Sequence, residues 1–468
     1  MKREKGVKQC LKLLFTALLF VMVLTTGVKA QAATWVEINQ KNFPDSRVRK
    51  ELKSNASYNE NYKCVKGKYY VNVTGVTRFD YSIYDGGGIT NFDFLNKFPR
   101  LESVQLQNVN VTRIDLSKNT KLKEIYILNA PRLVSIKCPK SIQSLSLYGT
   151  NISRLDTKGL QNLTNLKVRC SIKLKMIDVS GNKKLESIDV GGSSLRSVDV
   201  RKCKRLTSLN CYGEKVTDLK IGKNTKLKNI SVYNNKNLTD LDISQCPNLE
   251  SIYASNTGIT EFDTSKYRNL QTLSLSGTAI KTLDVTKCPK LNMLYVADTA
   301  IKNLNVTKCY KLSYLDVSNT SIKTLNVTKN KNLWGVAASG NKKLKRLNVT
   351  QCPKLNIVDI SGSGISYINL TRNKKLTTFA PSNTRMKVAG LKGRTNLSLT
   401  YYGLKKGSVV PLKDIIGSGY KLSQKNKNIR FNPKTMKFQI LRKSKYSDQL
   451  FLKKGNSRCD INIRYTSK

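Results

Sequence analysis

Hydrophobic residues return along this chain at an almost constant interval. From Leu291 the pattern runs LxxLxVxxTxI and then LxVxxC, and the next anchor leucine is Leu312, so the period is 312 − 291 = 21 residues. Successive anchors are 20 to 22 residues apart and stand at Leu101, Leu122, Ile142, Leu163, Leu185, Leu206, Leu227, Leu249, Leu270, Leu291, Leu312, Leu333, Leu355 and Leu376. Self-similarity at this period is the signature of a leucine-rich-repeat solenoid.

Each repeat unit has two strand-like halves. The first half reads LxxLxV, as in residues 270–275, and the second half is shorter, as in residues 283–285. Alternation within each half sends leucine and valine inward and the residues between them outward. The pattern therefore predicts a β-rich repeat solenoid over residues 79–397.

The segment before the array lacks the period. Residues 33–78 are expected to form an N-terminal cap, because the apolar end of a solenoid must be covered. Pro44 and Asp45 favour the start of a helix within it, which would place Val48 and Leu52 on the buried face.

The period is lost again after residue 397. Short strands are expected near Val409, Ile429, Phe438 and Ile461, between turns rich in Gly, Asn and Lys. We interpret residues 398–468 as a small C-terminal β domain, with an immunoglobulin-like sandwich as one arrangement. Further degenerate repeats are the alternative.

Residues 1–32 have the organisation of a secretory signal peptide. A basic start precedes an apolar run at 11–28, and Ala30 and Ala32 provide the small residues of a cleavage site. A membrane anchor is the alternative, which the small residues at the end of the run disfavour. No later apolar run is long enough to span a membrane, so we expect a mature chain that is secreted, extracellular or associated with the cell wall.

The net charge is extreme. The chain has 83 Lys and Arg against 30 Asp and Glu, a formal charge of +53, and removal of the signal segment's +5 leaves 53 − 5 = +48. One set of lysines directly precedes the same turn position in each repeat and is expected to form a stripe: Lys202, Lys223, Lys266, Lys287, Lys308 and Lys329. Like charges in rows about 5 Å apart repel one another, so an anionic cell-wall polymer is a candidate partner. A solvated face is the alternative, and nucleic acid is not expected for an exported chain.

Eleven cysteines in an exported chain suggest disulfides, but their positions argue against this for most of them. One slot, three residues before an anchor, alternates mainly between Asn and Cys: Asn119, Asn182, Cys203, Asn224, Cys246, Tyr267, Cys288, Cys309, Asn330, Cys352 and Asn373. A disulfide framework would not accept asparagine, whereas an inward slot that donates hydrogen bonds to turn carbonyls accepts an amide or a thiol. Cys288 and Cys309 lie in consecutive repeat units, which we call rungs. A disulfide bridge between these two residues remains an open alternative.

Catalytic chemistry finds little support. The chain has no histidine, which removes Ser/His/Asp and Cys/His arrangements and histidine metal ligands. Asp414 and Asp448 in the terminal segment are the candidates for a carboxylate pair. We expect no enzyme activity, no cofactor and no metal site.

The turn LxxLxVSxTxIxxLDVTKC resembles the 21-residue repeats of secreted Gram-positive and gut-bacterial surface proteins, loosely called internalin-like. The resemblance covers about residues 36 to 397, and residues 36–49 resemble the helix that caps such arrays. A calcium-loop-like stretch often follows that helix in the family; residues 54–64 hold only Glu60, too few carboxylates for calcium. The resemblance implies a binding function, with ligands that differ widely between members.

Outward positions of the first half vary and are rich in aromatic residues. They include Tyr126, Tyr148, Tyr212, Tyr233, Tyr253, Tyr295 and Tyr314, with Trp334 at the edge of the next rung. Tyrosine among serine and asparagine is the composition of adaptable binding surfaces, although cross-strand tyrosine pairs can also merely stabilise a sheet. We expect these rings to bind ligand, on the assumption that the first half forms the concave sheet.

The sequence therefore favours a cell-surface adhesin or receptor-like protein that recognises a protein or glycan on a host or bacterial surface. The alternative is a cationic structural protein of the envelope, held on anionic cell-wall polymer. Salt-tolerant binding to one ligand would favour the first, and binding that is lost in salt would favour the second.

Overall fold

The computed structural model describes residues 32–57, 59–82, 88–213, 215–383, 386–424, 426–444 and 446–465. Residues 1–31 of the expected signal peptide lie outside these described residues. The chain divides into two compact units, Met1–Leu145 (unit 1) and Ser146–Lys468 (unit 2), which are described separately.

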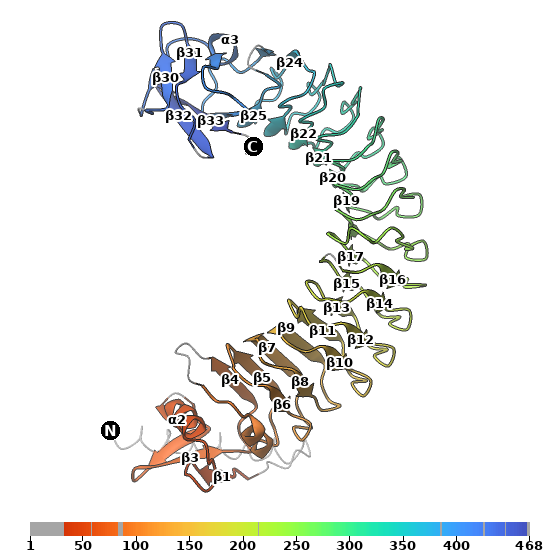
Figure 1. Cartoon of the computed structure of the whole chain (residues 1–468), viewed down its shortest axis with the longest axis vertical. Coiled ribbons are helices and arrows are strands. Elements are labelled where there is room, and N and C mark those ends of the chain that lie inside the picture. The colour runs from red at the N-terminus through yellow and green to blue at the C-terminus, as the bar shows by residue number, and fades with distance from the viewer. Residues whose placement is uncertain are drawn as a thin grey trace, which may run out of the picture. The chain divides into compact units, whose positions relative to one another are not determined.

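Unit 1 begins with a small antiparallel sheet and a helix (Figure 1). The elements are β1 (Trp35–Glu37), β3 (Lys68–Asn72) and β2 (Tyr62–Val65), hydrogen-bonded in that order, with α2 (Ser46–Ser54) and the 3-10 turn η1 (Asn55–Ser57). Asp45 caps α2 by accepting a 2.8 Å hydrogen bond from the Arg47 N–H. Val48 and Leu52 are buried, so the helix predicted at Pro44–Asp45 is confirmed.

The parallel repeats start in unit 1. First-half strands β4 (Arg78–Ser82), β5 (Ser103–Gln107) and β7 (Glu124–Ala130) pair in parallel, and second-half strands β6 (Arg113–Asp115) and β8 (Ser135–Lys137) form a separate parallel pair. The 3-10 turn η2 (Asp93–Lys97) precedes β5, and β9 (Ser144–Thr150) lies at the boundary between the units.

A continuous parallel sheet of first-half strands runs through unit 2. The strands are β11 (Asn165–Arg169), β13 (Ser187–Asp189), β15 (Ser208–Asn210), β17 (Asn229–Ser231), β18 (Ser251–Tyr253), β19 (Thr272–Ser274), β20 (Met293–Tyr295), β21 (Tyr314–Asp316), β22 (Gly335–Ala337), β23 (Ile357–Asp359), β25 (Thr378–Ala380) and β27 (Leu397–Tyr402). The strands from β11 to β25 each pair through three residues. The middle residue of each three, from Leu166 to Phe379, is buried, and the residues on either side of it face outward. This arrangement confirms the solenoid fold that the repeat predicts.

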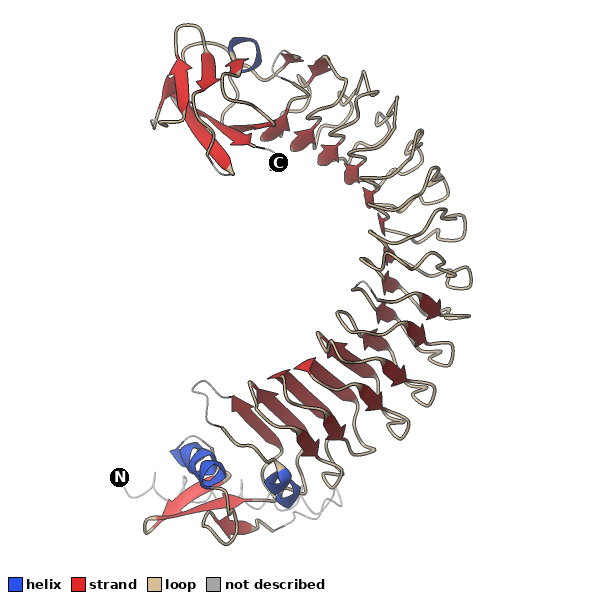
Figure 2. Ribbon diagram, viewed as in Figure 1, coloured by secondary structure: helices blue, strands red, loops and turns tan. Residues whose placement is uncertain are grey.

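The second halves of unit 2 pair only in places. The pairs are β10 (Arg154–Asp156) with β12 (Met176–Asp178), β14 (Ser197–Asp199) with β16 (Asp218–Lys220), and β24 (Tyr367–Asn369) with β26 (Lys387–Ala389). Among the described residues between Lys220 and Tyr367, the second halves make one isolated bridge, Asn326 to Asn348. Within unit 2, the paired first-half strands follow the inner side of its curve, and loops lie on the outer side (Figure 2).

The predicted inward polar slot is present at the turns that carry Asn or Cys. Asn330 Nδ2 donates to the carbonyl oxygens of Val306 (3.0 Å) and Cys309 (2.9 Å), and Cys309 Sγ donates to Val285 O at 3.4 Å. The thiols of Cys203, Cys246, Cys288 and Cys352 donate in the same way. Burial raises the pKa of Cys309 to about 12, so its thiol keeps its proton and stays a donor. Cys288 and Cys309 are both free thiols.

The slot needs a donor, whereas an acceptor is used in only some rungs, as at Asn182, whose Oδ1 accepts from Thr157 Oγ1 at 2.7 Å. The Oδ1 atoms of the slot residues Asn119, Asn224, Asn330 and Asn373 are buried without a hydrogen-bond partner. A thiol therefore replaces the amide without losing an acceptor interaction, which accounts for the alternation of Asn and Cys. At the C-terminal end of the row of slot residues, Arg394 supplies the donors. Its Nη1 donates to Asn373 O and its Nη2 donates to Leu370 O.

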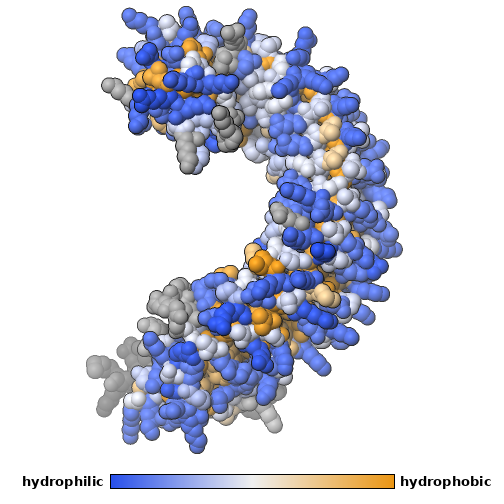
Figure 3. Space-filling view, in the orientation of Figure 1, coloured by the Kyte–Doolittle hydropathy of each residue, from blue (hydrophilic) through white to orange (hydrophobic). Residues whose placement is uncertain are grey.

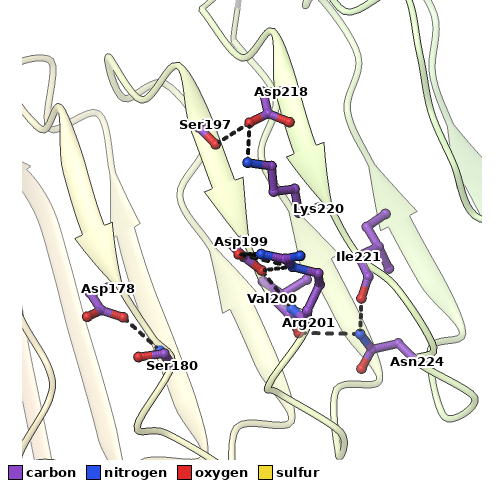
Figure 4. A network of polar contacts seen from close by, with 10 residues as sticks. All are labelled: Asp178, Ser180, Ser197, Asp199, Val200, Arg201, Asp218, Lys220, Ile221 and Asn224. Atoms are coloured by element: carbon purple, nitrogen blue, oxygen red, sulfur yellow. Dashed lines mark hydrogen bonds and ion pairs between the residues drawn. The ribbon is translucent and has the colours of Figure 1, made fainter.

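Outward aspartates of the second half act as local turn caps. Asp178 accepts from the Ser180 N–H at 2.9 Å, and Asp199 accepts from the Arg201 N–H at 3.0 Å (Figure 4). These i to i+2 bonds are Asx turns, which position the chain as it leaves the strand. The repetition of Asp and Asn along this face is therefore structural.

The C-terminal segment continues the first-half sheet and adds a second one. Strand β27 pairs in parallel with β33 (Ser457–Arg464), which pairs with β32 (Ser447–Lys454), and β32 pairs with β29 (Lys421–Leu422). A separate antiparallel sheet holds β28 (Val409–Pro411), β31 (Lys437–Ile440) and β30 (Ile429–Asn432), and α3 (Lys413–Ile416) follows β28. The four short strands predicted near residues 409, 429, 438 and 461 are confirmed.

Substitutions at the slot test its donor chemistry. We expect Asn330→Ala to lower the free energy of unfolding by about 1–3 kcal/mol, because two buried carbonyls lose a donor. Asn330→Cys is expected to cost less than about 1 kcal/mol, since the thiol still donates. Urea unfolding of both variants measures the difference, and equal losses would contradict the donor explanation.

Candidate functional site

The aromatic residues predicted at outward positions lie along the first-half sheet. In unit 2, Tyr253 and Tyr295 occupy the third position of β18 and β20, and Tyr314 occupies the first position of β21. Tyr212 and Tyr233 lie two residues beyond the ends of β15 and β17. Of the remaining tyrosines, Tyr126 lies half-buried on β7 in unit 1, and Tyr148 lies half-buried on β9 at the unit boundary.

Tyr212 and Tyr233 stack face to face. Their ring centroids are 4.7 Å apart and the planes differ by 5°, as expected for the same slot on adjacent rungs. Gly191 leaves room for this stack, because a Cβ there would come within 2.3 Å of Tyr212 Cε1. The stack lies next to an ion pair, with a buried carboxylate and a partly exposed arginine, that the sequence did not reveal.

That ion pair joins Arg169 to Asp189 on the neighbouring strands β11 and β13. Arg169 Nε donates to Asp189 Oδ2 at 2.7 Å, and the carboxylate also accepts from Asn210 Nδ2 at 3.3 Å. The Asp189 side chain is 3% exposed, and its hydrogen bond raises the pKa of Arg169. The Arg169 guanidinium lies 5.9 Å from the Tyr212 ring centroid, within the range of a cation–π contact.

Three further rings form a second cluster. The Tyr314 ring centroid is 5.3 Å from that of Tyr295 and 5.1 Å from that of Trp334. Gly335 lies under Tyr314, where a Cβ would approach Tyr314 Cδ2 to 2.6 Å. We call Tyr295, Tyr314 and Trp334 the aromatic cluster. Trp334 is 39% exposed, and Tyr253, two strands before Tyr295, is 40% exposed.

The glycine positions could have been found from the sequence. Gly191 and Gly335 stand in outward register positions where most other repeats carry a side chain, and each is 21 residues from a tyrosine, Tyr212 and Tyr314. A glycine in a strand often marks the close approach of another group. The sequence signal is therefore a glycine that replaces a side chain on one rung and a tyrosine 21 residues away on an adjacent rung.

The six lysines of the predicted stripe are all exposed. Each lies in the turn that follows a second half, away from the first-half sheet. The structure therefore separates the two expected sites: aromatic side chains belong to the first-half sheet, and this set of lysines belongs to the turns.

An open groove on the second-half side of unit 2 was not predicted. Its volume is about 1070 Å³, and Leu283, Leu304 and Leu325 line it, with Lys323 and Lys345 among its polar residues. The sequence signal for it is a switch at one repeat position from Asp, as in residue 284, to Asn in residues 305, 326, 348 and 369.

The carboxylates considered for catalysis have different surroundings. Asp414 is exposed in α3. Asp448 is 7% exposed and accepts hydrogen bonds from Tyr465 Oη (2.6 Å), Asn428 Nδ2 (2.9 Å) and the Ser444 N–H (3.3 Å). Burial alone would raise the pKa of Asp448, but these hydrogen bonds outweigh it and lower the pKa. Such a carboxylate holds loops together.

A pH series tests this role of Asp448. Because its folded-state pKa is lowered, the stability it contributes is present above its unfolded pKa of about 3.9 and is lost as the pH falls through the folded value. We expect Asp448→Asn to destabilise the protein by about 1–3 kcal/mol at pH 7 and by much less at the acidic end of the series. Urea unfolding measures this, with Asp414→Asn as the exposed control. A loss that does not change with pH would contradict the assignment.

The described part of the chain contains neither a membrane-spanning helix nor a cluster of metal ligands. Among the described helices, none combines the length and apolar character needed to cross a membrane. Among the described residues, the Cys, Asp and Glu side chains do not form a group of three or more that could hold a metal ion.

Comparison with known proteins supports the fold. No family model and no curated protein matches the chain. A solved structure of the functional domain of InlJ from Listeria monocytogenes, which includes a cysteine ladder, is 20% identical with a TM-score of 0.60, and the match covers 94% of this chain and 100% of that one. An internalin (InlF) from the same organism is 15% identical with a TM-score of 0.49, covering 78% of this chain and 100% of that one. The chain therefore has the leucine-rich-repeat solenoid fold seen in internalin-type proteins.

Proposed function

We propose that this protein is a secreted or cell-surface binding protein that recognises a protein or glycan through its first-half sheet. The observation that carries the proposal is the aromatic cluster with the neighbouring Tyr253, a set of partly exposed rings on one continuous sheet. An adhesin or receptor-like role follows from such a surface on an exported chain.

The sheet suits this role because it is rigid and its backbone is already paired. Rings held on paired strands lose little conformational entropy on binding, and tyrosine and tryptophan supply large contact areas with polar tips. Because Gly335 has no side chain, the Tyr314 ring can pack over this position, which a Cβ would block. Aromatic anchors that become buried when a ligand binds carry much of the binding energy at interfaces.

Stabilisation of the sheet is the simpler explanation for ring pairs. It fits Tyr212 and Tyr233, which stack fully on each other. It fits Trp334 and Tyr253 less well, because each leaves more than a third of its surface exposed to water. We therefore assign ligand binding first to the aromatic cluster with Tyr253.

A second candidate function is attachment to an anionic polymer of the cell wall. The six exposed lysines of the stripe and the net charge of +53 favour it. Charge attraction of this kind weakens as salt is added, whereas binding by buried rings persists.

The aromatic proposal is tested by replacing Tyr253, Tyr314 and Trp334 with serine together. We expect the ligand found on protein and glycan arrays at moderate salt to bind the variant about a hundredfold more weakly, because hot-spot residues are lost. The urea unfolding transition of the variant reports whether the fold survives.

The matched control replaces two tyrosines with comparable exposure that are not part of this surface. Tyr310 and Tyr367 are 51% and 53% exposed, in a turn and in the second-half strand β24. The control is expected to bind like the unaltered chain. Equal binding by the folded triple variant would show that the first-half surface is not the recognition site.

A further inference from the structure

The groove beside Leu304 exists because neighbouring second halves are not paired there. Among the described residues between Lys220 and Tyr367, the second halves make a single isolated β-bridge. The first halves of the same rungs stay fully paired. Within the described part of the chain, the backbone N–H groups from Asn303 to Val306 donate no hydrogen bond. Unpaired backbone donors therefore line an open space.

Asparagine side chains add further donors to this groove. Asn305 Oδ1 accepts from the Thr307 N–H (3.1 Å) and from Thr307 Oγ1 (2.7 Å). Asn326 and Asn348 make the same pair of bonds with the threonine two residues later. Because each Oδ1 is occupied, each Nδ2 amide points away from the turn, and none of the three donates to a described residue.

The same position carries aspartate in the preceding rungs. Asp284 accepts from the Thr286 N–H at 2.8 Å and so makes the turn that Asn305 makes. Its remaining oxygen presents a negative charge where asparagine presents an N–H donor. Between residues 284 and 305 the exposed edge therefore changes from an anionic acceptor to a neutral donor, and the turn itself is preserved.

The side chains around these donors include cations that are not paired with a carboxylate. Lys323, Lys345 and Arg346 line the groove, are exposed, and make no ion pair with any described carboxylate. Asp284 is the single acid in the lining, so the net charge of the lining is 3 − 1 = +2. Three threonines of the lining are each followed directly by a lysine, namely Lys287, Lys308 and Lys329. Hydrophilic residues cover the outer margin of unit 2 (Figure 3).

We propose that this groove, lined by Asn305, Asn326, Asn348, Lys323, Lys345 and Arg346, binds a linear phosphodiester polymer that carries no bases, such as a chain of phosphate-linked alditols. Repeating donors and cations on successive rungs match an anion that repeats along a chain. Arginine and N–H donors suit phosphate oxygens, and charge complementarity selects the anion. The lining holds no aromatic ring, whereas single-stranded nucleic acids are normally held by stacking on such rings.

This inference rests on the second candidate function and gives it a site. It is independent of the aromatic surface, because no residue of the aromatic cluster lines the groove. A negative result for the polymer would therefore leave recognition by the first-half sheet untouched, and loss of array binding in the aromatic variant would leave the groove untouched.

The test replaces the asparagines of the groove with aspartate, which is the residue at the same position in the preceding rungs. Asn305→Asp, Asn326→Asp and Asn348→Asp together keep the turn, as Asp284 shows, and reverse the polarity of the groove. We expect at least a roughly tenfold loss of affinity for poly(glycerol phosphate) at low salt and a weaker dependence on salt. Titration of the mature chain with this polymer, at several salt concentrations, measures both quantities.

The control removes the same charge elsewhere. Lys41, Lys50 and Lys68 are exposed in unit 1, and their replacement by glutamine also lowers the net charge by three. The control is expected to bind within about twofold of the unaltered chain. An equal loss in both variants would show that bulk charge alone attracts the polymer, and would overturn the site.

Two further outcomes would also overturn the proposal. Absence of binding to poly(glycerol phosphate) at low salt would remove both the groove and the second candidate function. Tighter binding of single-stranded DNA than of poly(glycerol phosphate), lost in the groove variant, would show that the occupant is a nucleic acid. Matching urea transitions for all variants confirm that each is folded.

Discussion

Most rungs of this solenoid satisfy the carbonyls that they bury at their turns with one inward donor, an asparagine amide or a cysteine thiol. Asn330 reaches Val306 and Cys309, which lie 24 and 21 residues earlier, so the same side chain also ties consecutive rungs together. Because the donor fixes the turn, the residues around it are free to vary. This freedom lets outward positions carry aromatic rings on one side and charges on another.

Much of this fold could be predicted because each rung contacts mainly its neighbours. The 21-residue period predicted the inward rows and the slot, and it puts Tyr212 and Tyr233, 233 − 212 = 21 residues apart, at the same position of adjacent rungs. What the period alone does not predict depends on departures from the repeat. Gly335 matters only through Tyr314 on the rung before it, and the groove depends on which second halves fail to pair. The Asp448 network joins residues of the C-terminal segment, where no period guides the reasoning.

The two sides of unit 2 differ in what their backbones can offer. On the first-half side the backbone N–H and C=O groups are hydrogen-bonded to neighbouring strands of the parallel sheet, so only side chains can recognise a ligand. Aromatic rings on flat strands suit that task. On the second-half side between Lys220 and Tyr367, the open rungs leave backbone N–H groups without a hydrogen-bond partner in the described part of the protein, so small donors and charges suffice to bind a ligand. Both surfaces follow from one geometry, in which pairing on the inner side of the curve accompanies separation on the outer side.

Charge compensation is also uneven along the second halves. Where β14 and β16 pair, acids and bases are matched: Asp199 bonds Arg201, and Asp218 bonds Lys220 (Figure 4). Beyond Asp284 the repeat position becomes asparagine, while cations such as Lys323 and Arg346 continue. Repulsion among these cations opposes the close approach of the rungs, in the region where the second halves are open. A bound polyanion would relieve this repulsion and would therefore stabilise the folded chain in proportion to its binding.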